Sequence, residues 1–118
     1  MEKIVRQALL FDFYGELLTE HQRKVYTDVI SEDMSYSEIA EEYGVSRQGI
    51  FDLVRRCDKI LLDYEEKLRL VEKFSKARES MKDISDTMAV LKEKNSDPEL
   101  SPLIDRIEQR TEEIIEDF

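Results

Sequence analysis

Residues 36–55 read YSEIAEEYGVSRQGIFDLVR, and the fold depends on this stretch. Ser35 and Glu38 have the spacing of a capping box, in which each side chain satisfies a free backbone amide near the other, so a short helix is predicted to begin here. Gly44 supplies the positive φ that ends this helix, and Ser46 can cap a second helix two residues later. A short helix, a tight turn and a longer helix in this order are typical of a helix-turn-helix.

The apolar residues around the turn agree with this geometry. Ala40 is small where two helices must approach closely, and four larger apolar residues are predicted to form one wedge shared by both helices. These four residues are Ile39, Val45, Ile50 and Leu53. With the wedge turned inward, the polar side chains at the start of the second helix project outward, where a recognition helix meets base edges.

These outward side chains are the candidate DNA-reading residues. Arg47 can grip a guanine through two parallel hydrogen bonds and Gln48 can pair with an adenine, each contact being worth about 1–3 kcal/mol of discrimination. Ser46 can bind a phosphate while it caps the helix. The candidates at this helix start are Ser46, Arg47, Gln48, Phe51, Asp52 and Arg55.

Basic residues near this helix are predicted to form a phosphate clamp that is independent of sequence. They are Arg55, Arg56 and Lys59, together with Arg23 and Lys24 on an earlier helix. Asp52 opposes this role, because phosphate repels a carboxylate unless that carboxylate accepts a hydrogen bond from cytosine. The alternative interpretation is that the charged residues form only the solvated side of an amphipathic helix, which is the commonest fate of such residues.

Apolar residues at helical spacings predict two helices before the motif, over residues 3–14 and 20–31. Gly15 follows the first of these helices and is expected to end it in the left-handed conformation. From Arg47 an apolar stripe continues at spacings of three and four as far as Leu91. No clear breaker separates the long helix of the motif from the helical segment that follows it.

The strongest loop signal in the second half of the chain covers residues 95–98, which read NSDP. Ser101 then resembles an N-cap with proline at the first helical position, so a final helix is expected. This helix is predicted to expose one apolar side, formed by Leu103, Ile107, Ile114 and Phe118. No sustained alternation of apolar and polar residues indicates a strand, so the predicted fold class is all-α with six helices.

The composition narrows the function classes. The 118 residues include 28 acidic and 18 basic residues, for a net charge of −10. This surplus of acid opposes the nonspecific coating of nucleic acid, so any such contact must come from a local basic patch. The longest apolar run covers residues 8–11 and is too short for a membrane span, and the chain opens without the pattern of an export signal.

Catalysis is not indicated by any motif. The sequence has no glycine-rich phosphate loop, no Ser-His-Asp set and no paired acids in an evident pocket, so neither an enzyme activity nor a cofactor is expected. Cys57 is the one cysteine and His21 the one histidine, which gives neither a disulfide within the chain nor a complete metal site. A lone thiol is typical of a reducing compartment, and a cytoplasmic protein is predicted.

The predicted organisation is one compact unit with an appendage. Residues 1–62 are expected to form the helix-turn-helix domain, and residues 63–118 a C-terminal helical extension used for self-association. The extension carries an apolar seam, which must be covered by the last helix or by a second chain. DNA sites that such motifs read are commonly two-fold, so a homodimer is the expected assembly. The seam residues, which keep a four-three alternation, are Ala77, Met81, Ile84, Met88 and Leu91.

The chain from LLFDFYGELLTEHQRKVY to SYSEIAEEYGVSRQGIFDLVRRCDKILLDYEEKL resembles the YlxM family of helix-turn-helix proteins. The resemblance covers about the first two-thirds of the sequence. Its segments FDFY, LLT, IAEEYGVSRQ and DYEEKL are fairly specific when taken together. SEIAEEYGVSRQGI alone resembles, more generally, the helix-turn-helix in the fourth region of bacterial sigma factors.

The resemblance implies a small cytoplasmic bacterial protein with a domain like sigma region four. It also implies a link, by gene neighbourhood, to the GTPase of the signal recognition particle and a role in regulating that pathway. Two functions therefore remain open. The first is a DNA-binding regulator whose partner is double-stranded DNA. The second is a non-enzymatic interaction protein that contacts the RNA or the GTPase of the particle through the same basic surface or the acidic C-terminal helix.

Overall fold

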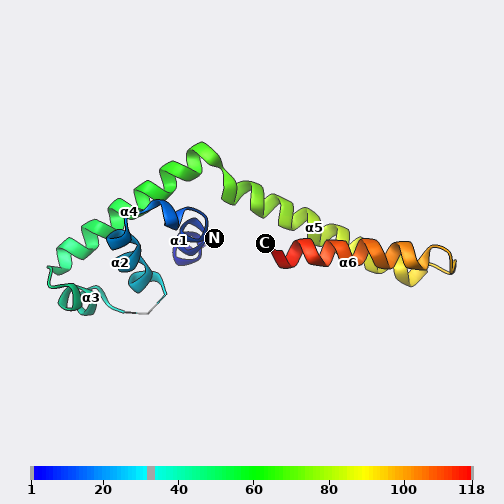
Figure 1. Cartoon of the computed structure of the whole chain (residues 1–118), viewed down its shortest axis with the longest axis horizontal. Coiled ribbons are helices and arrows are strands. Elements are labelled where there is room, and N and C mark those ends of the chain that lie inside the picture. Colours follow the sequence, from blue (N-terminus) through cyan, green and yellow to red (C-terminus); the bar gives the residue numbers. More distant parts are fainter. Residues whose placement is uncertain (1, 32–33, 118) are drawn as a thin grey trace. The chain divides into compact units, whose positions relative to one another are not determined.

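The structure, a computed structural model, describes residues 2–31 and 34–117, and the regular elements of this part of the chain are all helices. The predicted all-α class with six α-helices is confirmed, and one short 3-10 helix accompanies them (Figure 1). In chain order the elements are α1 (Lys3–Tyr14), η1 (Gly15–Leu17), α2 (Glu20–Ile30), α3 (Tyr36–Tyr43), α4 (Arg47–Leu68), α5 (Leu70–Lys94) and α6 (Ser101–Asp117).

The chain divides into two compact units, Met1–Val71 and Glu72–Phe118. In the first unit α1, α2 and α3 gather along α4, which is the longest helix of that unit (Figure 1). One side of α4 carries the core, and the other side faces away from it. The core residues of α4 are Ile50, Val54, Cys57 and Leu61, and they pack with Leu10, Tyr14, Leu18, Val25, Tyr26, Ile39, Ala40 and Val71.

Local signals set the helix starts before α4. Ser35 and Glu38 form the predicted capping box of α3, and Thr19 and Gln22 form a second capping box at the start of α2. Gly44 ends α3 with a φ of 67°, in the left-handed region, so the predicted turn is confirmed. The starts of α2 and α3 and the end of α3 thus follow from residues that lie next to them in the sequence.

Gly15 has a different role from the predicted one. Its φ is −58°, which any residue adopts, and the chain continues directly into η1. A Cβ atom at this position would come within 2.9 Å of the ring of Phe11. The prediction of a left-handed Gly15 is therefore wrong, because close packing rather than backbone conformation requires glycine here.

The long helical run breaks at Arg69, where the sequence contains no clear breaker. Arg69 has a φ of 55° and separates α4 from α5. The hydroxyl of Tyr14 donates to the carboxylate of Glu65 and accepts from the amide of Leu70 at 3.0 Å. The same carboxylate accepts from the amide of Val71 at 3.0 Å. Side chains of α1 and α4 thus satisfy the first free amides of α5, which a helix start otherwise leaves without partners.

Two further carboxylates tie the helices of this unit together. Asp58 of α4 accepts hydrogen bonds from the Tyr26 hydroxyl of α2 and from the Gln7 amide of α1, the latter at 3.0 and 3.1 Å. Burial and the hydrogen bond to Asp58 raise the pKa of Tyr26 above its ordinary value. The hydroxyl of Tyr43 on α3 donates to Asp28 on α2 at 2.7 Å. These bonds hold α1, α2 and α3 in place around α4.

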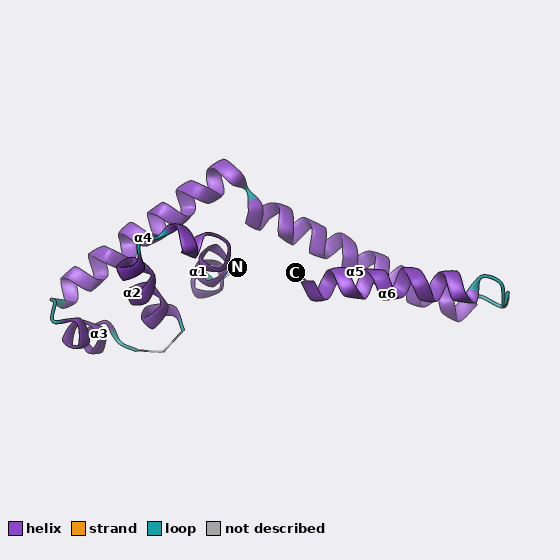
Figure 2. Ribbon diagram, viewed as in Figure 1, coloured by secondary structure: helices purple, strands orange, loops and turns teal. Residues whose placement is uncertain are grey.

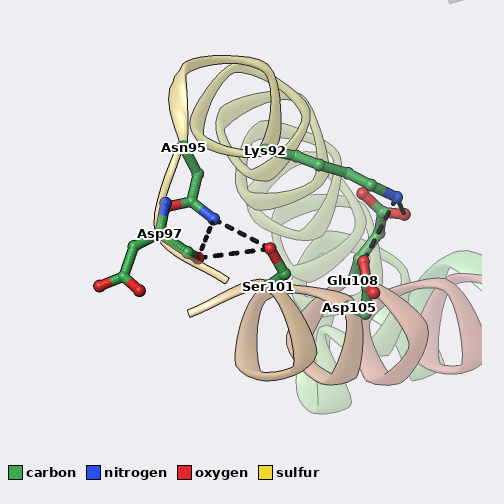
Figure 3. Close-up of polar contacts among 6 residues, drawn as sticks. All are labelled: Lys92, Asn95, Asp97, Ser101, Asp105 and Glu108. Atoms are coloured by element: carbon green, nitrogen blue, oxygen red, sulfur yellow. Dashed lines mark hydrogen bonds and ion pairs between the residues drawn. The ribbon is translucent and has the colours of Figure 1, made fainter. Parts of the chain in front are cut away.

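The second unit is a hairpin in which α5 and α6 run antiparallel, side by side (Figure 2). The predicted loop at residues 95–98 is confirmed, and Asn95 closes it by donating to the carbonyl of Asp97 at 3.0 Å and to the Ser101 hydroxyl at 3.2 Å. Figure 3 shows these contacts beside Lys92, whose Nζ lies 3.3 Å from the carboxylates of both Asp105 and Glu108. These ion pairs join the two helices of the hairpin near the loop.

The hairpin packs through only part of the predicted seam. Met88 on α5 is buried, as are Ile104 and Thr111 on α6, so the last helix supplies cover for the seam. Ala77 and Met81 are half-buried, whereas Ile84 and Leu91 are exposed. The apolar side predicted for the final helix is indeed exposed at Leu103, Ile107 and Ile114, and Phe118 lies outside the described residues.

Candidate nucleic-acid interface

The turn before α4 is built from short-range hydrogen bonds. The hydroxyl of Ser46 accepts from the amide of Gly49 at 3.0 Å and thereby caps α4. The amide of Val45 donates to the carbonyl of Ala40 at 3.0 Å, across the left-handed Gly44. Residues 46–49, at the start of α4, are exposed.

The apolar wedge behind this turn lacks one of its predicted members. Ile39 and Ile50 are buried and Leu53 is half-buried, but the side chain of Val45 is 47% exposed. The prediction for Val45 is therefore wrong. The chain reverses at Gly44, which leaves the following residue on the outer corner of the turn while Ile39 and Ile50 fill the space between α3 and α4.

Four side chains of α4 form what we term the outward row. Their positions are separated by four, three and four residues, so they lie on one line along the helix, on the side opposite the buried residues. All four are exposed, and all four were candidates from the sequence. The outward row consists of Gln48, Asp52, Arg55 and Lys59. The structure thus brings reading candidates and clamp candidates together on one surface.

Gln48 and Asp52 are joined within the outward row. The Nε2 atom of Gln48 donates to the Oδ1 atom of Asp52 at 3.0 Å, one helical turn further along α4. The carboxylate that opposes phosphate binding is thus a hydrogen-bond partner of a candidate reading residue. The sequence spacing of four residues permits such a bond, but it does not determine which partners a side chain chooses.

Phe51 and Arg55 form a second pair at the edge of the outward row that borders α3. The ring of Phe51 lies 6.3 Å from the ring of Tyr36 on α3, measured between centroids. The guanidinium carbon of Arg55 lies 5.9 Å from the Phe51 ring centroid, which is within the range of a cation–π contact. Phe51 is 42% exposed, so it offers apolar surface beside the charge of Arg55.

Arg56 lies on the other edge of the row, in an open groove between α4 and the start of α2. The groove has a volume of about 420 Å³. Its lining residues are Thr19, which caps α2, His21 and Gln22 from α2, and Gly49, Asp52, Leu53 and Arg56 from α4. His21 and Gln22 were not among the candidates, because the sequence alone does not place the start of α2 beside α4.

Arg23 and Lys24, the two basic candidates on α2, lie outside the groove that contains Arg56. Lys24 forms an exposed ion pair with Glu20, one turn earlier on the same helix, with a separation of 3.5 Å. Arg23 is half-buried, and its backbone amide donates to the carbonyl of Thr19 within the first turn of α2. Neither Arg23 nor Lys24 lines the groove that contains Arg56.

Two other features are not found in the part of the chain that the structure describes. Within residues 2–31 and 34–117, side chains that ligate metals do not gather in groups of three or more. No helix in these same ranges is both long and apolar enough to cross a bilayer.

Residues 1–100 match a family described as "Putative helix-turn-helix protein, YlxM / p13 like". The chain belongs to this family. The predicted resemblance to the YlxM family is thereby confirmed, and the helix-turn-helix of α3 and α4 lies within the matched residues. What the family description states is the motif, and it names no ligand.

Relatives of YlxM/p13-like type cover nearly the whole chain. A UPF0122 protein of Clostridium acetobutylicum is 44% identical over 109 residues, which are 92% of this chain and 94% of the relative. A UPF0122 protein of Shouchella clausii is 42% identical over 112 residues, covering 92% and 97%. A UPF0122 protein of Acetivibrio thermocellus is 37% identical over 116 residues, covering 98% and 99%. The similarity therefore includes the C-terminal hairpin as well as the helix-turn-helix.

Proposed function

We propose that this chain is a non-enzymatic regulatory protein of the cytoplasm that binds double-stranded DNA through the first turns of α4. The observation that carries this proposal is the outward row, which follows directly after the helix-turn-helix turn. A recognition helix contacts base edges with its N-terminal residues. Exposed Arg47 and Gln48 occupy those positions in α4.

We propose a separate role for each of these side chains. Arg47 and Gln48 read bases, and Arg55, Arg56 and Lys59 contact phosphates on either side. Ser46 offers its hydroxyl to a phosphate at the start of the helix. Phe51 suits apolar contact with the methyl group of thymine, because its ring is exposed beside the row. The domain that carries these contacts is similar, in this proposal, to region four of sigma factors.

Selection of bound sequences from random duplexes, at a stated salt concentration, tests DNA reading directly. We expect the wild-type protein to enrich a short motif and Arg47→Ala to lose the preference at one base pair. Arg78→Ala is the matched control, because it removes the same charge from an exposed position on α5. Wild-type protein that enriches no motif contradicts the proposal.

The salt dependence of binding tests the phosphate clamp. If roughly four to six basic side chains neutralise phosphates, the logarithm of the affinity falls with the logarithm of the salt concentration at a slope of about −4 to −5 per subunit. Replacing Lys59 with alanine should reduce that slope by about 1 without changing the preferred motif. A slope near zero contradicts an electrostatic clamp on α4.

We also propose that two copies bind together as a homodimer, with residues 1–62 contacting DNA and residues 63–118 contacting the second copy. Ile84 and Leu91 form an exposed stripe on α5, and Ile107 and Ile114 form one on α6. With about 100° of rotation per residue, both stripes lie on the side of the hairpin opposite the Lys92 ion pairs. Two copies that each carry a net charge of −10 repel one another. The two apolar stripes contain no acidic residue, so a contact through them brings no acidic side chains of the stripes together. Sedimentation of only a 14.0 kDa species at tens of micromolar contradicts the dimer.

A second candidate function is supported by the surplus of acid. A chain with 28 acidic residues is poorly suited to coat a polyanion. The alternative proposal is an interaction protein that contacts the RNA or the GTPase of the signal recognition particle, and the acid surplus favours the GTPase, because RNA is a polyanion as well. Arg47→Ala should leave that association intact if the helical tail makes the contact. Association with the particle together with no enrichment of DNA sequences favours this alternative.

A further inference from the structure

The hydrogen bond between Gln48 and Asp52 determines how the Gln48 amide is oriented. The amide has two N–H donors on Nε2 and one carbonyl acceptor, Oε1. Rotating the amide by half a turn brings Oε1 against the carboxylate of Asp52, where two acceptors repel each other. The 3.0 Å bond from Nε2 to Oδ1 thus selects one of the two orientations.

The groups that remain free on Gln48 are those that adenine requires. One N–H of Nε2 is occupied by Asp52, which leaves the second N–H and the carbonyl Oε1. In the major groove, adenine presents the N7 acceptor and the N6 donor, and a glutamine amide pairs with both at once. Both Gln48 and Asp52 are exposed and belong to the outward row, so the bond leaves the amide accessible.

We infer that Asp52 is a positioning residue that holds the Gln48 amide in the orientation that reads adenine. This inference rests on the proposed DNA-binding function. It gives a reason for a carboxylate on a surface that is proposed to face phosphates. Asp52 lowers the affinity for every sequence by repulsion, and it raises the discrimination at one base pair by fixing its neighbour.

Arg55 does not compete for this role. Its guanidinium lies over the ring of Phe51, 5.9 Å from the centroid, which directs the charge toward the edge of the row that borders α3. Asp52 also lines the groove that contains Arg56 and His21. The Gln48 bond uses one carboxylate oxygen, Oδ1, so the second oxygen of Asp52 is available to that groove.

The test compares base preferences, position by position, in sequence selection at one salt concentration. Gln48→Ala first locates the base pair that Gln48 reads. Asp52→Ala should then weaken the adenine preference at that same base pair by roughly 2-fold, which is what an exposed Gln–Asp bond at this spacing contributes, while its affinity for unrelated duplexes rises. Asp52→Asn removes the charge and offers a donor as well as an acceptor, so it pairs with the Gln48 amide in either orientation; it should weaken the preference as Asp52→Ala does and share the rise in general affinity.

Asp63→Ala is the matched control, since Asp63 is an exposed acid on α4 that the structure does not place beside Gln48. It should raise general affinity slightly and leave every base preference unchanged. Circular dichroism verifies that each variant keeps its helical content.

Three results overturn the inference or the proposal behind it. If Asp52→Ala keeps in full the preference that Gln48→Ala abolishes, Asp52 does not position Gln48. If Asp52→Ala instead loses a cytosine preference at a neighbouring base pair, Asp52 reads a base itself and the inference is wrong. If the wild-type protein enriches no sequence at all, DNA reading itself is refuted, which distinguishes that failure from the first two.

Discussion

Cys57 lies inside the core of the first unit, and its side chain is 0% exposed. Burial raises the pKa of its thiol to about 11, and the nearby charge of Asp58 acts in the same direction. Because the thiolate is the reactive form, a thiol reagent at pH 8 should label native protein far more slowly than protein unfolded in urea. Equal labelling rates in the two states contradict a buried Cys57.

Tyr43 provides a prediction of pH dependence. Its hydrogen bond to Asp28 raises the pKa of the hydroxyl to about 12, and burial contributes in the same direction. A raised pKa means that the bond stabilises the fold below pH 10 and is lost as the pH rises through about 12. Tyr43→Phe should lower the free energy of unfolding by about 1 kcal/mol at pH 7. Urea titrations of both proteins should show this difference shrinking above pH 10.

Single residues show where sequence reasoning succeeds and where it does not. Gly44 was predicted correctly, because a left-handed φ at a helix end is a local property of the backbone. The prediction for Gly15 was wrong, because the role of this residue depends on the ring of Phe11. The prediction for Val45 was wrong as well, because the turn geometry exposes its side chain. The outward placement of Gln48 and Arg55 follows from helical spacing, whereas the contacts that they make with Asp52 and Phe51 do not follow from spacing alone.

At the scale of elements, the boundary between α4 and α5 gives the sharpest test. Arg69 adopts a left-handed conformation that costs a residue with a Cβ atom roughly 1 kcal/mol relative to glycine. Arg69→Gly should therefore raise the free energy of unfolding by up to about 1 kcal/mol in chemical denaturation. Arg69→Ala is the control, since it removes the side chain and retains the backbone cost. A less stable Arg69→Gly protein shows that the arginine side chain contributes more than its backbone costs.

The same boundary explains why one helical run became two helices. The apolar stripe continues across residues 68–71 at helical spacings, so the sequence itself contains no stop signal. Tyr14 comes from α1, and only the folded unit brings its hydroxyl to Glu65 and to the amide of Leu70. A break held by residues this far apart in the chain cannot be recognised from local propensity.

At the scale of the whole molecule, the extent of the first unit can be measured with fragments. Residues 1–62 contain the proposed DNA contacts, but the compact unit extends to Val71. A 1–71 fragment keeps the Tyr14–Glu65 contact and the burial of Val71, which is worth about 1.5–3 kcal/mol. Urea denaturation should therefore show that 1–71 is more stable than 1–62 by a few kcal/mol. Equal stabilities contradict a structural role for residues 63–71.

The proposed dimer also makes a prediction at this scale. Ile107 is 49% exposed on α6, and burying such a side chain at an interface is worth about 1.5–3 kcal/mol. Ile107→Glu should raise the dissociation constant of the dimer roughly 10- to 100-fold in sedimentation experiments, with unchanged helical content. Ile4→Glu is the control, because Ile4 is 50% exposed on α1. An unchanged dissociation constant excludes this face of the hairpin as the contact.

The sequence by itself determined the helix-turn-helix and the all-α class, because capping residues, a left-handed glycine and helical spacing act between neighbours in the chain. The tertiary structure alone decided where the long helical run ends, which faces of the hairpin are buried, and that the start of α2 lies beside α4. Those features depend on side chains that meet only after the chain has folded. The two clearest cases are the hydrogen bond from Tyr14 to Glu65 and the burial of Met88 in the second unit.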